Sequence, residues 1–163
     1  MISQIPPLKK KYLKYDNFKD QTIQDIFTDE ELKDAVKLEA FELSTGILFN
    51  DGKGKFTLRG LPIEAQFSTM YAIEIFDFDR DDNLDILLGG NLYRVKPEAG
   101  RYDASFGLFL KGDGQGGFST VDSKSSGFFV DGEVRDMELI RIGKIDFLLV
   151  ARNNDSIQFF KIN

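Results

Sequence analysis

Apolar residues in the first forty positions recur at the spacing of amphipathic helices. From Ile5 to Tyr15 they follow one another mostly at intervals of three and four residues, which places them on one helical face. The stretch Thr28-Asp-Glu-Glu31 has the form of a capping box ahead of a further apolar run. We therefore expect three short helices between about residues 6 and 40, in an N-terminal helical segment that spans residues 1–44.

From about residue 45 the pattern changes to short apolar runs of the kind that form β-strands. Gly-rich stretches separate neighbouring runs, as hairpin turns do. Short strands joined by tight turns predict a mainly β fold for residues 45–163, behind the short helical segment. The expected strands cover residues 45–50, 55–59, 71–76, 85–90, 106–111, 118–121, 134–142, 144–151 and 156–162.

The β region contains two pairs of similar segments. Residues 48–57 and 109–119 both consist of an apolar run, a Gly-rich turn, and then Phe with a hydroxyl residue. Residues 85–91 are similarly matched by residues 146–153. The copies lie about sixty residues apart in both cases, so a unit of about four strands recurs. Repeats of this size are typical of β-propeller blades.

The amino-acid composition removes several kinds of chemistry. The chain contains no Cys and no His, which excludes a disulfide, a cysteine-zinc site and a hydrolase triad that depends on His. Carboxylate, hydroxyl, Lys and Arg groups remain. Carboxylates without imidazole or thiol are the ligand set of a hard cation such as calcium or magnesium.

The charge balance bears on the class of partner. The formal net charge is −6, which argues against a nucleic-acid partner because such binding requires a basic face. No segment approaches the roughly 18 apolar residues of a membrane span, so we expect none.

The densest group of oxygen-bearing side chains lies between two expected strands. Asp77, Asp79, Asp81, Asn83 and Asp85 occupy every second position. A tight loop with this spacing can turn its oxygens inward, and calcium takes six to eight oxygens at roughly 2.3–2.6 Å. We expect the four aspartates to supply carboxylates, position 83 to offer its main-chain carbonyl, and Ca²⁺ to be the bound ion.

A plain acidic turn is the alternative, because Asp and Asn are ordinary turn residues. Against it, the four carboxylates have no lysine among them and only Arg80 nearby. They would repel one another without a cation, which favours metal binding.

The loop resembles the calcium loop of the FG-GAP (VCBS) repeat family, which includes integrin α-subunit propellers and bacterial proteins related to the cartilage acidic protein/UnbV group. The family signature, a strand, Asp-x-Asp-x-Asp-Gly-x-x-Asp and a strand, is matched by residues 77–85 except at Asp82, where the family usually has Gly. The second copy, from Asp136 to Asp146, keeps only its final Asp and has a shortened turn. We expect no metal there, and Asp146 to cap or hydrogen-bond the turn.

This resemblance covers about residues 45–163 and implies a partial β-propeller of about two blades. Residues 45–59 correspond to the outer hairpin of a blade whose inner strands are missing, and the last blade ends after three strands. The family setting implies a C-terminal piece of a longer protein that is extracellular, periplasmic or outer-membrane-associated.

These observations predict a calcium-binding repeat module with a structural or recognition role, and not an enzyme. Its partner would be an unknown protein or glycan, and its open blade edges could pair two copies of the chain. The alternative is a carboxylate-only hydrolase acting on glycans, with Glu133 and Asp136 as the conceivable pair. The long segment 91–103 is either a binding surface or a loop folded over its own blade, with Arg101 paired to a carboxylate.

Overall fold

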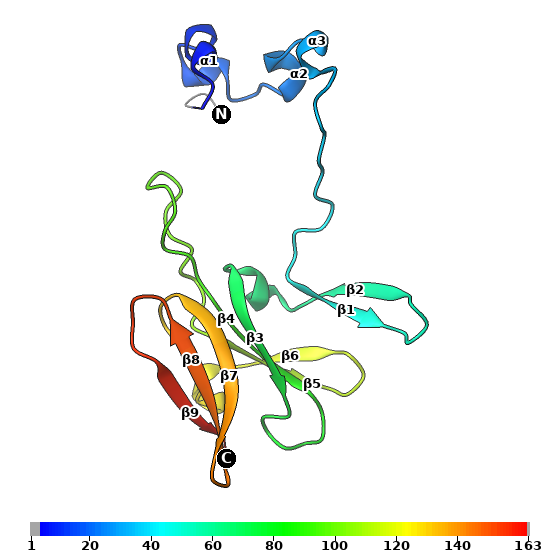
Figure 1. Cartoon of the computed structure of the whole chain (residues 1–163), viewed down its shortest axis with the longest axis vertical. Helices are drawn as coiled ribbons and strands as arrows, with labels where there is room; N and C mark the ends of the chain where they lie inside the picture. The colour runs from blue at the N-terminus through cyan, green and yellow to red at the C-terminus, as the bar shows by residue number, and fades with distance from the viewer. Residues whose placement is uncertain (1–3, 163) are drawn as a thin grey trace. The chain divides into compact units, whose positions relative to one another are not determined.

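The computed structural model of the chain describes residues 4–162, so residues 1–3 and 163 of the two expected regions lie outside the described part. The chain divides into two compact units, Met1–Glu42 and Leu43–Asn163 (Figure 1). The boundary expected after residue 44 lies close to this division.

The first unit consists of short helices. Leu8, Tyr12 and Ile26 form its small buried cluster, and the predicted capping box is present, with the Thr28 backbone N–H donating to Glu31 Oε2 at 2.8 Å. The three predicted short helices are confirmed. They are α1 (Pro6–Lys11), α2 (Ile23–Ile26) and α3 (Asp29–Leu32), with a 3₁₀ turn, η1 (Tyr15–Asn17), between the first two.

The second unit is built from three antiparallel sheets, and none of them is closed. A mainly β fold behind a helical segment is therefore confirmed, and the strands lie within two residues of the predicted runs. The first sheet is β1 (Gly46–Asn50) and β2 (Phe56–Gly60); the second is β3 (Met70–Phe76), β4 (Asp85–Gly90), β5 (Leu108–Gly112) and β6 (Phe118–Val121); the third is β7 (Val134–Ile142), β8 (Ile145–Arg152) and β9 (Gln158–Ile162).

Two short helical turns in this unit were not predicted: η2 (Ile63–Gln66) and α4 (Ser123–Ser126). Asp122 caps α4 by accepting from the backbone N–H groups of Lys124 and Ser125. Each is only four residues long, which is too short to show a helical period in the sequence.

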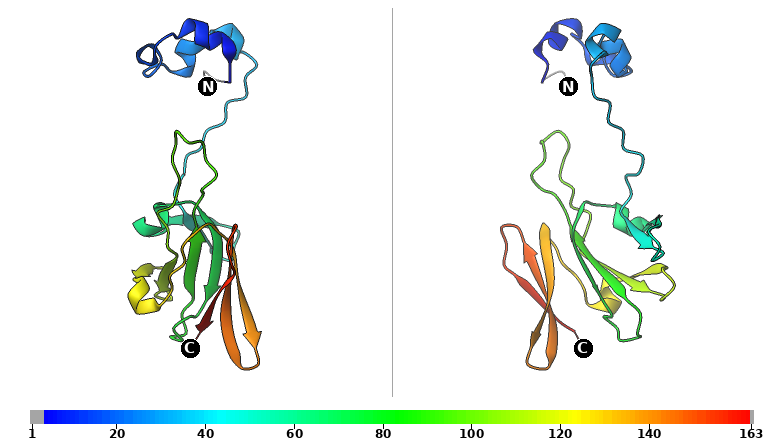
Figure 2. Two further views of the ribbon diagram at one scale, coloured as in Figure 1. Left: turned by 90° about the vertical axis from the view of Figure 1, so that its left-hand side faces the viewer. Right: turned by 45° about the vertical axis from the view of Figure 1, so that its right-hand side comes forward.

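The second and third sheets pack side by side, and β3 and β7 contact each other (Figure 2). An apolar core lies between them. A second apolar cluster, around Leu88, Leu110 and Ala65, joins the second sheet to the first. The buried members of the shared core are Ala72, Leu87, Phe128, Val130, Val134, Met137, Leu148 and Val150.

The strand pairs β3–β4 and β7–β8 have the same register. Each has one irregularity near the start of its first strand, between Met70 and Ala72 in one pair and between Val134 and Asp136 in the other. The pairs also end alike. The Asn91 N–H donates to the Thr69 carbonyl at 2.9 Å, as the N–H of Asn153 does to its partner carbonyl at 2.8 Å.

The hairpin turns β1–β2 and β5–β6 also share one pattern of hydrogen bonds. Asp51 Oδ1 accepts from the N–H groups two and four residues further on, at 2.7 and 3.1 Å. Asp113 Oδ1 does the same at 2.7 and 2.8 Å. In both turns the aspartate N–H donates to the carbonyl four residues later. The sequence parallel between these hairpins thus corresponds to matching local structures.

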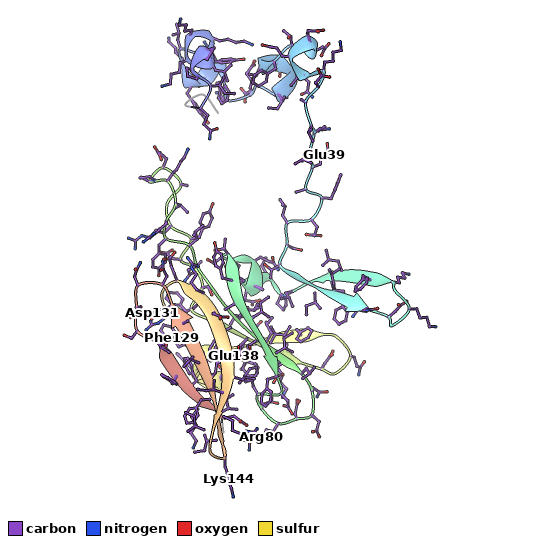
Figure 3. The ribbon with its side chains drawn as sticks, in the orientation of Figure 1. Glu39, Arg80, Phe129, Asp131, Glu138 and Lys144 are labelled. Atoms are coloured by element: carbon purple, nitrogen blue, oxygen red, sulfur yellow. The ribbon has the colours of Figure 1, made fainter. Side chains whose placement is uncertain are left out.

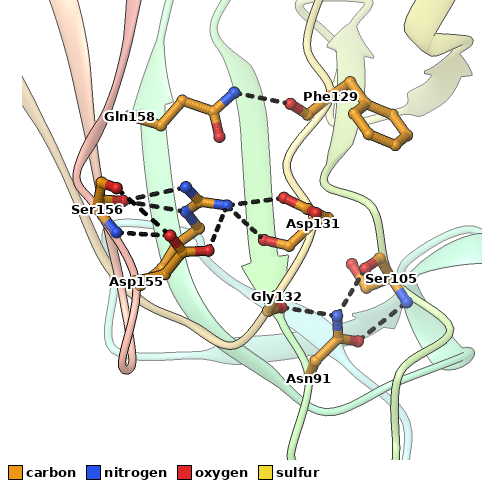
Figure 4. A network of polar contacts seen from close by, with 9 residues as sticks. Asn91, Ser105, Phe129, Asp131, Gly132, Asp155, Ser156 and Gln158 are labelled. Carbon is orange, nitrogen blue, oxygen red and sulfur yellow. Dashed lines mark hydrogen bonds and ion pairs between the residues drawn. The ribbon is translucent and has the colours of Figure 1, made fainter.

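Polar side chains join the second and third sheets at the end where β4 and β8 finish (Figure 4). Buried Asn91 donates to the carbonyls of Ser105 and Gly132 at 2.7 and 2.9 Å. Nearby, the Arg152 guanidinium contacts Asp131 and Asp155 at 2.7 and 3.1 Å. This network fixes one end of the two sheets, and the aspartate loop lies at the other end.

Candidate metal centre

The aspartate loop is the connection between β3 and β4 and covers residues 77–84. Arg80, within this loop, and Lys144, in the turn between β7 and β8, lie at the same end of the second unit (Figure 3). The backbone of Arg80 and Asp82 is left-handed, with φ of 62° and 68°. Asp82 stands where Gly would adopt this conformation without strain.

Three of the five predicted ligands converge. Asp77, Asp79 and Asp85 each offer one carboxylate oxygen, and these oxygens lie within 4.8 Å of one another. An ion between them could approach all three carboxylates. Only oxygen donors converge there, and this donor set fits a hard cation such as Ca²⁺.

Backbone hydrogen bonds fix two of these carboxylates. Asp85 is fully buried; its Oδ2 accepts from the Phe78 N–H at 3.0 Å and its Oδ1 from the Gly112 N–H at 2.9 Å. Asp77 accepts from the N–H groups of Asp81 and Asp82 at 3.1 and 3.0 Å. Each carboxylate oxygen has two lone pairs, so these bonds leave capacity for an ion.

The fourth aspartate, Asp81, lies outside this group of three carboxylates. Asp81 Oδ1 accepts from the Asn83 N–H at 2.9 Å, and its Oδ2 is directed to Lys111, at 2.8 Å. The Asn83 side chain lies against the β5–β6 turn. A Cβ at Gly114 would come within 2.2 Å of Asn83 Oδ1. The loop as folded therefore offers three carboxylates, with Asp81 engaged by Lys111.

Lys111 of β5 is the residue that the sequence analysis missed. Its ammonium contacts both Asp79 Oδ2 and Asp81 Oδ2. Hydrogen bonds to Asp79 and Asp81 raise the pKa of Lys111. The bond from Lys111, together with the Asn83 N–H, lowers the pKa of Asp81. In sequence only Arg80 lies near these carboxylates, but the fold adds the positive charge of Lys111, which is distant in sequence.

The second copy of the strand pair has no acidic loop. Gly143 and Lys144 alone connect β7 to β8. Register aligns Asp85 with Phe147, since Phe76 pairs with Asp85 and Ile140 pairs with Phe147. The sequence parallel between Asp85 and Asp146 was therefore wrong by one residue.

Asp146 instead forms a cross-strand ion pair. Its carboxylate accepts from Arg141 Nε and Nη2 at 2.5 and 2.9 Å. The hydrogen bonds from Arg141, followed by the charges of Arg141 and Arg80, lower the pKa of Asp146. Asp146 thus hydrogen-bonds across the strands beside the turn. Among residues 4–162, the group of carboxylates with metal-binding geometry does not include Asp146.

Glu133, which was considered with Asp136 as a pair for hydrolysis, has a visible structural role. Glu133 is buried; its Oε1 accepts from the Tyr93 N–H and from Arg135, both at 2.7 Å, and its Oε2 accepts from Asn153 at 2.8 Å. These bonds, led by that from Tyr93, lower the pKa of Glu133, which is opposite to the shift that a general acid needs.

A second group of carboxylates lies between β3 and β7. Burial, with the charges of Glu138 and Asp136, raises the pKa of Glu74. None of these residues lines the cavity of about 540 Å³ between the second and third sheets. The lining of that cavity combines apolar and polar side chains, and Asp79 is its one acidic residue.

The long segment after β4 folds back on itself. Leu92 and Tyr102 form an isolated antiparallel bridge with N–H···O distances of 2.8 and 3.0 Å. The Arg101 guanidinium lies over the Tyr93 ring, 5.1 Å from its centroid. The carboxylate partner proposed for Arg101 is thus replaced by an aromatic ring.

Comparison with known protein families, with characterised proteins and with solved structures finds no match to this chain. Among residues 4–162, no helix is both long enough and apolar enough to cross a bilayer.

Proposed function

We propose that the chain is a calcium-binding module with a structural or recognition role, and that it is not an enzyme. The observation that carries this proposal is the convergence of Asp77, Asp79 and Asp85 to within 4.8 Å. Asp85 is buried and held by two backbone N–H groups, so one ligand is already positioned. Calcium would link the two strands at the loop and reduce the repulsion among its carboxylates.

We further propose that residues 45–163 are FG-GAP/VCBS-type repeats forming part of a β-propeller. The shared irregularity of β3–β4 and β7–β8 supports a repeated unit, as do the matching turns of β1–β2 and β5–β6. In this interpretation the sheets of two, four and three strands are an outer hairpin, one complete blade and a blade that lacks its last strand.

The same proposal places the module outside the cytoplasm or in association with the outer membrane. Extracellular calcium modules bind with dissociation constants of roughly 10⁻⁴–10⁻³ M. Its partner would be a protein or a glycan, and a second copy could pair with an open sheet edge. Exposed apolar side chains on β3 and on the first sheet, among them Ile73, Ile75, Leu48 and Leu58, support an association of this kind. Light scattering would then report a mass above that of the 18.5 kDa chain.

Thermal unfolding tests calcium binding. At about tenfold excess over the dissociation constant, calcium would stabilise the fold by roughly 1.4 kcal/mol, which raises the melting temperature by about 3–6 °C. Chelator should reverse the increase, and Asp79→Ala should abolish it. Asp146→Ala, in the corresponding turn of the third sheet, should leave it intact. A melting temperature that is unchanged by millimolar calcium would refute the proposal.

A further inference from the structure

We infer that Lys111 is an internal counter-cation that holds the aspartate loop in the ion-free protein and competes with calcium for it. This inference rests on the proposed calcium site and concerns its regulation. Lys111 lies on β5, outside the loop, so its position is an observation independent of the aspartate spacing. A cationic group is already seated among the loop carboxylates.

Lys111 and the expected ion share a ligand. Asp79 belongs to the group of three converging carboxylates, and its Oδ2 also contacts the lysine ammonium. An ion bound at 2.3–2.6 Å from Asp79 would place two cations on one carboxylate. Their repulsion at roughly 5 Å changes affinity by about tenfold even in water. Calcium binding therefore favours withdrawal of the lysine.

Withdrawal of Lys111 would also release Asp81. The lysine holds Asp81 Oδ2 at 2.8 Å, outside the group of three. Asp81 lies in the loop between Asp79 and Asp85, and once free it can turn toward the ion as a fourth carboxylate. The position of Asp81 thus follows from the ion-free pairing. The lysine side chain is 39% exposed, so it can move into solvent without disturbing the core.

The third sheet supplies a matched control for Lys111. Leu110 pairs with Ile86 on β4, and Phe160 pairs with Leu148 on β8. This register aligns Lys161 of β9 with Lys111 of β5. Lys161 also lines the cavity between the two sheets, but the turn of its own sheet has no acidic loop. Removing Lys161 changes the net charge of the protein by the same amount as removing Lys111.

The test compares calcium affinity in the full chain and three variants, Lys111→Met, Lys111→Gln and Lys161→Met. Calcium chloride alone is titrated at constant ionic strength by calorimetry, and unfolding in chelator is followed by circular dichroism. We expect both Lys111 variants to bind calcium about tenfold more tightly than the unchanged protein and to melt at lower temperature in chelator. Lys161→Met should match the unchanged protein in affinity. Two Lys111 variants keep the test valid if one fails to fold.

The outcomes separate the two proposals. Equal or weaker calcium affinity in the Lys111 variants, with binding by the unchanged protein, overturns the counter-cation inference and leaves the proposed function intact. Binding by the Lys111 variants alone supports the inference and overturns calcium binding by the natural chain. Absence of binding in every form overturns both. A tenfold gain in Lys161→Met as well would assign the effect to net charge and overturn the inference.

Discussion

The two strand connections β3–β4 and β7–β8 have the same scaffold and different chemistry. Both strand pairs share one irregularity and one closing hydrogen bond. The first is joined by the aspartate loop, residues 77–84, and the second by Gly143 and Lys144 alone. In the third sheet the strands extend further, so that Arg141 pairs with Asp146 and Ile142 with Ile145.

This difference shows that the strand pair can close without an acidic loop. A two-residue turn with Gly in the left-handed conformation, φ of 66° at Gly143, is sufficient to close the strand pair. The longer loop leaves Arg80 and Asp82 in that conformation without Gly and gathers carboxylates. Strained backbone of this kind is expected at functional sites. We therefore assign the proposed function to the loop and not to the sheet.

The largest expected effect comes from Asp85, which has no carboxylate counterpart in the third sheet. Asp85→Ala leaves the N–H groups of Phe78 and Gly112 without their acceptor. We expect a loss of about 2–4 kcal/mol in the free energy of unfolding and loss of the calcium response. Urea unfolding measures the first and calcium titration the second. Asp85→Asn, which keeps an acceptor oxygen, should lose less stability. A loss under about 1 kcal/mol for the alanine variant would contradict this role of Asp85.

A smaller effect is expected from exchanging the residues that hold the left-handed backbone. Gly143→Ala forces a side chain into a φ of 66° and should cost about 1 kcal/mol. Asp82→Gly makes the opposite change at a φ of 68° and should stabilise the protein by roughly 0.5 kcal/mol. Thermal unfolding in chelator measures both. If both substitutions stabilise the protein, or both destabilise it, the left-handed backbone does not account for the difference between the two connections.

The smallest effect concerns acid titration of the third-sheet turn. Arg141 lowers the pKa of Asp146. The contribution of this ion pair to the stability of the fold is therefore complete above the ordinary aspartate pKa of about 3.9. It is lost as the pH falls through the lower, folded value. In Arg141→Met the Asp146 pKa should rise toward the ordinary value, as followed by carboxyl NMR. Lys144→Met, which removes a charge from the same turn, should leave the Asp146 pKa close to its value in the unchanged protein.

Local patterns predicted the strands and the terminal helices well, because hydrophobic alternation and capping residues act over short distances. The aspartate spacing likewise indicated where carboxylates gather, and three of the four aspartates do converge. The placement of Lys111 could not be predicted in this way. It depends on the pairing of β4 with β5, which brings residues 85 and 112 into hydrogen-bond contact. The connection between these strands is long, and its length does not fix the register in which they pair.

The misalignment of Asp146 has a related cause. The apolar runs after Asp85 and Asp146 look alike in sequence, but a strand has a side-chain period of two, and a shift of one residue reverses the face. The register fixed by Asn91 and Asn153 aligns Phe147 with Asp85. Similarity between single residues of two copies therefore supports a shared function only when the pairing partners of both strands also correspond.

Calcium titration followed by two-dimensional ¹H–¹⁵N NMR tests the central claim most directly, since it observes both connections in one experiment. The proposal predicts saturable shifts for the backbone amides of residues 77–85 and of Gly112, with a midpoint of roughly 0.1–1 mM calcium. The amides of Gly143, Lys144 and Asp146 should not shift. Absence of saturable shifts in the aspartate loop up to about 10 mM calcium, or equal shifts at both connections, would contradict calcium binding at this loop.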